Sequence, residues 1–179
     1  SEAEVAQSLT NIIAEQTGQV AMTTFASNLA RVHAASQAAQ ATERRLIVAG
    51  RSLHRVIQVG IDTGYLPDDF GYLDQEHFGY MERGEALVIA TGSQGEPRAA
   101  MARIAEGSHR DIQLTRGDTV IYSSRTIPGN EKSILAVQNQ LAERGYKVIT
   151  DSDGLVHVTG HPRREELAQM FAWIKPQTL

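Results

Sequence analysis

Two histidines bracket a short segment near the end of the sequence, HVTGH at residues 157–161. Imidazole changes its charge near neutral pH, so a pair of imidazoles beside a threonine hydroxyl suits phosphate binding or general acid–base chemistry. On a helix, H-x-x-x-H would also suit a metal ion, but Gly160 and Pro162 disfavour a helix here. We therefore expect a tight turn after a strand. The alternative is a capped turn that places both histidines at a domain interface.

Small polar residues and glycines follow each of several short apolar runs. These turns comprise residues 25–28, 50–52, 91–96, 123–125 with 128–130, and 159–161. In a parallel sheet such turns share the carboxyl edge, where ligands bind in open α/β folds. Each turn also precedes a helix, whose unpaired first amide groups favour anions. With Arg51 and Arg125 as cations, the turns together predict a phosphate-binding rim, although each one alone is ordinary capping and turn chemistry.

The sequence contains no catalytic or nucleotide-binding fingerprint. No turn has the Gly-Lys-Ser/Thr of a Walker loop or the G-x-G-x-x-G of a dinucleotide site. Asp151 and Asp153 lie in a turn-like DSDG segment, and no set of three or four metal ligands or nucleophile with a neighbouring base is evident. We therefore expect this chain by itself to bind a ligand rather than to catalyse a reaction, and to hold no metal.

Apolar runs and amphipathic helices that alternate along the chain must position these turns. We expect strands at 20–24, 46–49, 86–90, 119–122, 146–149 and 156–158. We expect helices at 2–16, 29–41, 53–61, 97–106, 131–144 and 163–174, with Pro97 in the first turn of its helix. Residues 64–84 are interpreted as a long connection that can include one helical turn. The pattern predicts an α/β three-layer sandwich with a mostly parallel, Rossmann-like sheet.

The composition is that of an ordinary single domain. The chain has 179 residues, and 41% of them are hydrophobic, which is enough to fill one core. It has no apolar run of about 20 residues, no signal peptide and no cysteine, which fits a cytoplasmic protein. A net charge of −4 argues against a free-standing nucleic-acid-binding protein, so any such binding should be local or shared with another domain.

Taken in order, several segments resemble the β-CASP region of the bacterial RNase J family. They are TTFASNLARV (23–32), VAGRSL (48–53), VIATGSQGEPRAAMARIA (88–105), DTVIYSSRTIPGNE (118–131) and HVTGHPRREEL (157–167). The resemblance spans nearly the whole chain, and TGSQGEP, SSRTIPGNE and HVTGH are highly specific in combination. It implies that residues 1–179 form a single β-CASP domain, in which residues 163–179 lead back toward a metallo-β-lactamase domain.

The resemblance also implies a substrate-binding site. The family's H-V-S-G-H stretch matches HVTGH here, with Thr159 keeping the hydroxyl of the serine and Pro162 standing where alanine is usual. By the same match, His161 is the implied catalytic residue near the scissile phosphate. The candidate substrate-binding residues are His157, Val158, Thr159, Gly160, His161, Ser93, Gln94, Ser123, Ser124 and Arg125.

For the intact protein, the resemblance implies a zinc-dependent ribonuclease of RNA processing and decay. Such enzymes degrade RNA from the 5′ end, prefer a 5′-monophosphate, and also cut internally. The resemblance therefore implies RNA as the partner, zinc as the cofactor of the full-length enzyme, a full-length homodimer and no membrane. The family's zinc ligands lie in H-x-H-x-D-H and later motifs that we expect outside this chain. We thus expect the fragment alone to bind no zinc and to cleave no RNA.

Three alternatives remain open on the sequence. A stand-alone regulatory module that binds a nucleotide or sugar phosphate would explain the phosphate rim and the acidic net charge, but not the ordered set of motifs. A β-CASP endonuclease specialised for tRNA or messenger ends is less compatible with TGSQGEP and PGNE. A catalytically inactive scaffold would differ in the zinc ligands outside this chain.

Overall fold

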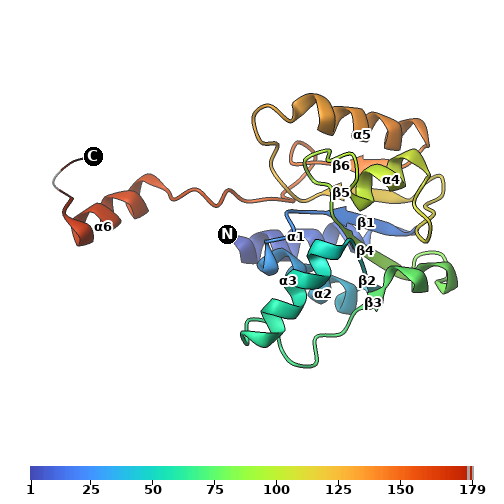
Figure 1. Ribbon diagram of the computed structural model, residues 1–179, viewed down its shortest axis with the longest axis horizontal. Helices are drawn as coiled ribbons and strands as arrows, with labels where there is room; N and C mark the ends of the chain where they lie inside the picture. Colours follow the sequence, from blue (N-terminus) through green and yellow to red (C-terminus); the bar gives the residue numbers. More distant parts are fainter. Residues whose placement is uncertain (177, 179) are drawn as a thin grey trace.

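A sheet of six parallel strands forms the centre of the computed structural model, in which residues 1–176 and 178 are described (Figure 1). The strands are β1 (Val20–Thr23), β2 (Arg45–Ala49), β3 (Leu73–Asp74), β4 (Ala86–Ala90), β5 (Thr119–Tyr122) and β6 (Lys147–Ile149). They lie in the order β3-β2-β4-β1-β5-β6, and every neighbouring pair is parallel. The connections from β1 to β2 and from β4 to β5 therefore each pass over an intervening strand.

Helices cover both faces of this sheet, which confirms the three-layer α/β prediction. On one face lie α1 (Glu2–Ala14), α2 (Leu29–Ala41) and α3 (Arg51–Asp62). On the other face lie α4 (Ala100–Glu106), α5 (Glu131–Glu143) and the 3₁₀-helix η1 (Gln75–Tyr80). Figure 1 shows the two helical layers on either side of the strands. The chain thus winds first along one face and then along the other, as in doubly wound folds.

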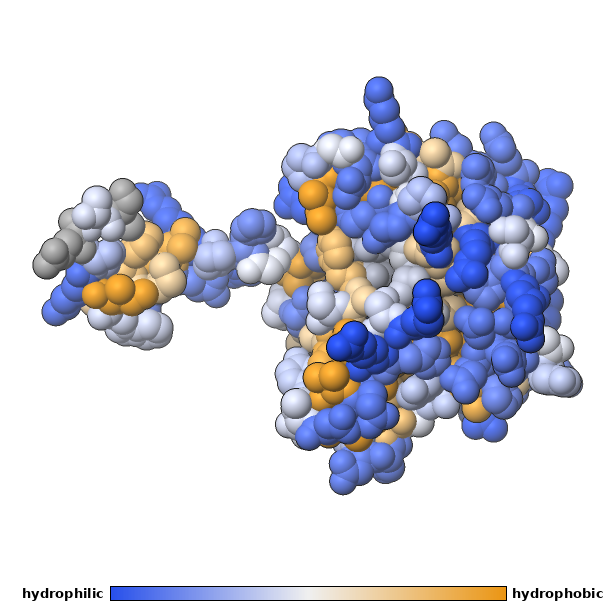
Figure 2. Space-filling model, viewed as in Figure 1, coloured by the Kyte–Doolittle hydropathy of each residue, from blue (hydrophilic) through white to orange (hydrophobic). Residues whose placement is uncertain are grey.

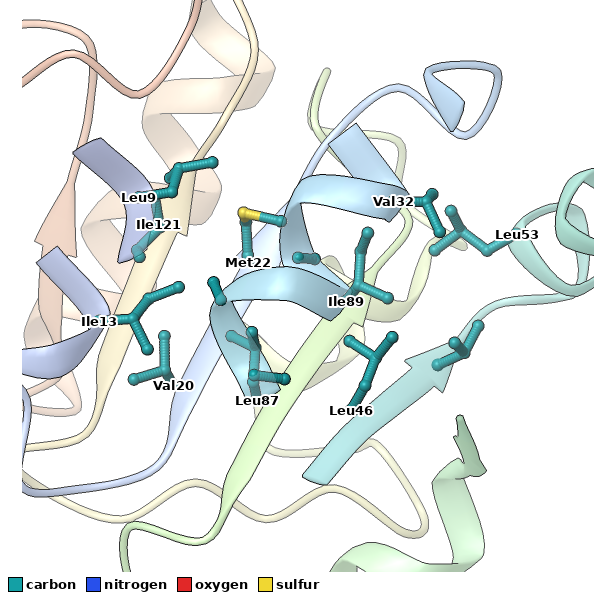
Figure 3. Close-up of a cluster of buried hydrophobic side chains, with 14 of the residues drawn as sticks. Leu9, Ile13, Val20, Met22, Val32, Leu46, Leu53, Leu87, Ile89 and Ile121 are labelled. Atoms are coloured by element: carbon teal, nitrogen blue, oxygen red, sulfur yellow. The ribbon is translucent and has the colours of Figure 1, made fainter. Parts of the chain in front are cut away.

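Side chains of successive strand residues point alternately into two apolar layers. On β1, Val20 and Met22 pack against α1 and α2, whereas Ala21 packs into the layer beneath α4 and α5. Figure 3 shows the first layer, in which Leu9 and Ile13 of α1 lie over the strands. Burying one such aliphatic side chain contributes about 1.5–3 kcal/mol. Because both layers are apolar, the central strands are uniformly hydrophobic, as parallel strands buried on both faces must be.

The start of α2 is set by its capping residue. Asn28 precedes the helix, and its Oδ1 accepts a hydrogen bond from the backbone N of Arg31 at 3.0 Å. Four alanines on the buried side of the helix let it approach the sheet closely; they are Ala34, Ala35, Ala38 and Ala39. The positive end of α2 therefore lies at the carboxyl end of β1.

Two predictions about strands differ from the structure. The predicted long connection 64–84 includes the expected helical turn, η1, but also the short strand β3, which pairs Leu73 with Ile47 and Asp74 with Val48. Two residues are too few to produce a recognisable periodicity. The predicted strand at 156–158 does not form, because the Val156 carbonyl accepts side-chain hydrogen bonds rather than those of a strand ladder.

The helix predicted from Pro97 begins three residues later, at Ala100. Residues 97–99 form a turn, in which the Ala99 N donates to the Glu96 carbonyl at 3.0 Å. Thr91 then defines the helix start, since its Oγ1 accepts from the Ala100 N at 3.2 Å and its carbonyl accepts from the Met101 N at 2.9 Å. Most other predicted boundaries differ from the structure by one or two residues.

The last helix, α6 (Arg164–Ile174), lies apart from the sheet at the end of an extended segment (Figure 1). It has no buried residue. Met170, Trp173 and Ile174 are exposed on it, with Trp173 76% exposed. Figure 2 shows apolar side chains gathered on this helix. An amphipathic helix without a packed apolar face derives little stability from the domain it is attached to.

Candidate functional site

A cleft of 980 Å³ lies at the carboxyl edge of the sheet. It is lined by Glu2, Phe25, Ser27, Asn28, residues 125–128 and residues 157–162. The chain leaves β1 toward α2 on one face and leaves β5 toward α5 on the other. The cleft therefore opens where the direction of winding changes, which is the usual ligand-binding position in open α/β sheets.

The segment 157–162 is held at this edge by the residue that precedes it. The Val156 carbonyl accepts hydrogen bonds from Arg31 Nη1 and from Ser123 Oγ, both at 2.7 Å. Arg31 and Ser123 are completely buried. The loop is thus tied to the start of α2 and to the end of β5, although it is not a strand.

His157 lies in the cleft, half-buried, beside several charged groups. Its Nδ1 is buried and has no hydrogen-bond partner among the described residues. Burial lowers the pKa of His157, and the guanidinium of Arg31 lowers it further; Glu2 and Asp151 act in the opposite direction. The lowered pKa favours the neutral form of His157 near pH 7.

Thr159 and His161 form the exposed part of the same segment. The backbone N of His161 donates to Thr159 Oγ1 at 3.1 Å, a local bond that shapes the turn. Because the hydroxyl only accepts in this bond, its own proton can still be donated to a ligand. Both side chains are exposed and line the cleft, as Arg125 does.

Gln94 positions the loop on the other side of the cleft. Its Nε2 donates to the Arg125 carbonyl at 3.0 Å, and its Oε1 accepts from the Ile127 N at 2.9 Å. Gln94 itself is buried, 7% exposed, and does not line the cleft. Its bonds fix the backbone of residues 125–127 and leave the Arg125 side chain exposed to bind an anion.

The structure brings together only part of the predicted site. His157, Val158, Thr159, Gly160 and His161 line the cleft together with Arg125. The remaining candidates are buried and do not line it; they are Ser93, Gln94, Ser123 and Ser124. Among the turns of the predicted rim, 50–52 and 91–96 do not reach the cleft. They lie against each other instead, since a Cβ added at Gly50 would be 2.5 Å from the Thr91 side chain.

The cleft can bind an anion through its own residues. Arg125, Asn28 at the start of α2, and the hydroxyl-bearing Ser27 and Thr159 all line it. In the part of the chain that the structure describes, no three His, Cys, Asp or Glu side chains are grouped to hold a metal ion. A zinc ion of the kind implied by the family resemblance therefore has no ligand set here.

Comparison with known proteins identifies the family. Residues 17–141 match the family model described as the β-CASP domain of ribonuclease J. The chain belongs to this family. Ribonuclease J of Sinorhizobium meliloti is 49% identical to it over 179 residues, which are 100% of this chain and 32% of that protein. Ribonuclease J 1 of Streptococcus pyogenes is 40% identical over 99% of this chain and 32% of that protein. Ribonuclease J of Mycobacterium tuberculosis is 37% identical over 100% and 32%.

The chain spans about a third of the length of each of these relatives. The share of 32% recurs in ribonuclease J proteins of distinct bacteria. Among the helices of residues 1–176, none has both the length and the apolar character needed to span a bilayer.

Some residues at the cleft were not predicted from the sequence. Glu2 lines the cleft, and Arg31 bonds to the Val156 carbonyl at the segment that enters it. Glu2 gave no signal, because an acidic residue in the first turn of a helix is ordinary. Arg31 did give a signal in the sequence. It lies four residues before Ala35 and seven before Ala38, so helical periodicity places this arginine on the buried side of the helix. Such an arginine needs buried partners.

Proposed function

We propose that this β-CASP domain binds the phosphodiester backbone of RNA in the cleft, as the substrate-binding part of a metal-dependent ribonuclease. The observation that carries the proposal is the convergence of Arg125, His157 and His161 around one cleft at the winding reversal. A guanidinium can pair with two phosphate oxygens at once. The relatives are named ribonucleases, so a phosphate diester is the anion that best fits the site.

The two histidines take different roles in this proposal. His157 is fixed by the bonds to Val156 and is neutral near pH 7, because burial lowers its pKa. It would accept or donate one hydrogen bond to the phosphate and orient it. His161 is exposed on the turn made by Thr159, and we assign it to the scissile phosphate, where it would stabilise charge or transfer a proton.

The remaining machinery is proposed for parts of the protein outside this chain. Zinc, and the activation of water that zinc supplies, are assigned to a metallo-β-lactamase domain, since residues 1–176 present no ligand cluster. Without that domain the 179-residue fragment should not cleave RNA. We further propose a preference for a 5′-monophosphate, cleavage both from the 5′ end and internally, a full-length homodimer, and action in the bacterial cytoplasm.

The proposal is tested in the full-length protein with 5′-monophosphorylated RNA. For His157→Ala we expect KM to rise about ten-fold, the size of one hydrogen bond to a charged group. For His161→Ala we expect kcat to fall by roughly 10²–10⁴, as for loss of an acid–base group. The matched control is His33→Ala, an exposed histidine of α2 outside the cleft. Unchanged kinetics in both cleft variants would contradict the proposal.

The full-length protein and its cleft variants also test the main alternative, a regulatory module that binds a nucleotide or sugar phosphate. A regulatory module would bind a free nucleotide or sugar phosphate in the cleft and show no affinity for RNA. Calorimetry with uridine monophosphate and with a short RNA distinguishes the two. Binding of the monophosphate alone, abolished by Arg125→Gln, would favour the module over the nuclease.

A further inference from the structure

Arg31 of α2 is a fully buried arginine directly behind the cleft. Its side chain is 0% exposed, and its carboxylate partner is Glu2, whose side chain is 45% exposed. Taking a charge out of water is costly unless several groups compensate it. Such a residue at the back of a binding site therefore needs an explanation beyond filling space.

The hydrogen bonds of Arg31 join separate elements of the fold. Nη1 donates to the Val156 carbonyl at 2.7 Å, to the Ser123 carbonyl at 3.3 Å and to Ser123 Oγ. Nη2 donates to Glu2 Oε2 at 2.8 Å. One guanidinium thus connects α1, α2, the end of β5 and the chain entering the cleft. A lysine ammonium on a single stem could not reach all of these acceptors together.

We propose that Arg31 is a positioning residue for the cleft: it holds the Val156 carbonyl against the end of β5 and thereby fixes His157 and sets the charge around it. Val156 has no ladder partner, so side-chain bonds are what keep this segment in place. The inference rests on the proposed function, because it concerns how the same cleft is prepared for a phosphate.

The charges facing His157 come from four segments. Arg31 from α2 and Arg125 from the loop after β5 lower its pKa, whereas Glu2 from α1 and Asp151 from the turn after β6 raise it; burial is the largest cause overall. Removing the charge of Arg31 should raise the pKa of His157, and removing the charge of Glu2 should lower it. These opposite shifts distinguish an electrostatic role from simple packing.

The test uses the full-length protein and 5′-monophosphorylated RNA, with kcat and KM measured across pH. The ionisation of His157 is identified as the one that His157→Ala removes. In Arg31→Gln we expect its midpoint to move to higher pH and KM to rise at least ten-fold, about 1.4 kcal/mol. In Glu2→Gln we expect the midpoint to move to lower pH. Arg31→Lys keeps the charge, so we expect a near-normal midpoint with a raised KM.

Arg44 provides a matched control. It is also buried, 8% exposed, and also donates to backbone carbonyls, from Nη1 to Gly18 at 2.8 Å and to Ala86 at 3.3 Å. These acceptors lie at the opposite edge of the sheet, before β1 and at the start of β4. We expect Arg44→Gln to lower the melting temperature without moving the midpoint or KM.

The outcomes distinguish failure of the positioning role of Arg31 from failure of the proposed function. If His157→Ala changes KM but Arg31→Gln behaves like Arg44→Gln, Arg31 is merely structural and the inference is wrong. If His157→Ala itself has no effect, the proposed function fails first. If Arg31→Gln does not fold, Arg31→Lys and Glu2→Gln still test the inference. An unshifted midpoint in Glu2→Gln together with a normal KM in Arg31→Lys would overturn it.

Discussion

The Gln94 side chain uses both ends of its amide inside the protein. Nε2 donates to the carbonyls of Ser93 and Arg125, while Oε1 accepts from the Ile127 N and from Asn130 Nδ2. A buried amide that is fully used in this way is a structural link rather than a ligand contact. It is the counterpart of Arg31 on the other side of the cleft.

Replacing Gln94 by glutamate tests this link. Gln94→Glu keeps the shape but has no donor for the carbonyls of Ser93 and Arg125. We expect the free energy of unfolding of the domain to fall by about 1–3 kcal/mol, the cost of leaving buried polar groups unsatisfied. Urea denaturation measures it, with the exposed Gln37→Glu as control. Equal stability of the two variants would contradict the assignment.

At the scale of elements, Gly95 sets the distance between the turn after β4 and helix α5. It has φ +73°, and a Cβ added there would lie 2.5 Å from the Ser133 carbonyl carbon in the helix backbone. A helix backbone cannot yield as a flexible side chain can. Close approach of the two elements, and with it the position of the 125–130 loop, thus depends on the missing side chain.

Comparison with Gly64 separates backbone strain from overpacking at Gly95. It has φ +71° but open space around its Cα, with nothing within 4 Å of an added Cβ. Both Gly64→Ala and Gly95→Ala incur the strain of a left-handed conformation, about 1 kcal/mol. We expect Gly95→Ala to cost a further 1–3 kcal/mol, approximately, because it also overpacks. Similar melting temperatures for the two variants would show that α5 does not pack as described.

The loop between α4 and β5 contains a buried histidine whose protonation we expect to destabilise the fold. His109 is buried, and its Nδ1 accepts from the backbone N of Asp111 at 3.3 Å and of Ile112 at 3.1 Å. Burial lowers the pKa of His109, and Arg103 lowers it further, whereas Asp111 raises it. Protonation would replace the acceptor by a donor and break both bonds.

The sign of the pH effect follows from this lowered pKa. The contribution of His109 is complete above the ordinary histidine pKa of about 6.5 and is lost as the pH falls through the lower pKa of the folded state. We expect the domain to become less stable from pH 7.5 to pH 5.5, and His109→Asn to reduce that dependence. Urea midpoints at both pH values measure it. The same dependence in the variant and the unmodified domain would refute the role of His109.

At the scale of the whole molecule, α6 is separate from the folded body, meaning the sheet and the helices α1–α5 packed on it. Because it has no buried residue, we expect removal of residues 163–179 to leave the melting temperature of the body unchanged. Removal of residues 1–14 is the contrasting control, since α1 buries Val5, Leu9 and Ile13, and we expect that truncation to unfold the domain. A large loss of stability without residues 163–179 would mean that α6 packs on the body.

The layered architecture could be predicted because it depends on pattern. Helix α2 and strands β4 and β5 occupy the predicted residues, since each is a long or uniformly apolar run. The pairing of Leu73 in β3 could not be predicted, as two residues carry no period. Nor could the bonds that replace a strand at Val156, because they come from Arg31 and Ser123, 125 and 33 residues away in the sequence.

The candidate site was predictable in location but not in the division of roles. The turn chemistry indicated the carboxyl edge, and HVTGH together with Arg125 does lie in one cleft there. Serine and glutamine at the same edge have the same composition as ligand contacts, yet Ser123 and Gln94 are buried supports. Whether a polar side chain faces solvent or a neighbouring backbone depends on tertiary packing, which no local pattern specifies.

The most direct test of the central claim is the salt dependence of RNA binding by the full-length protein and its Arg125→Gln variant. If Arg125 contacts a phosphate, the variant should bind short single-stranded RNA more weakly. The slope of log Kd against log salt should decrease by about 0.7, the value for one neutralised phosphate of a single strand. The control Arg98→Gln, an exposed arginine outside the cleft, should retain the original slope. An unchanged slope and affinity in Arg125→Gln would mean that RNA does not occupy this cleft.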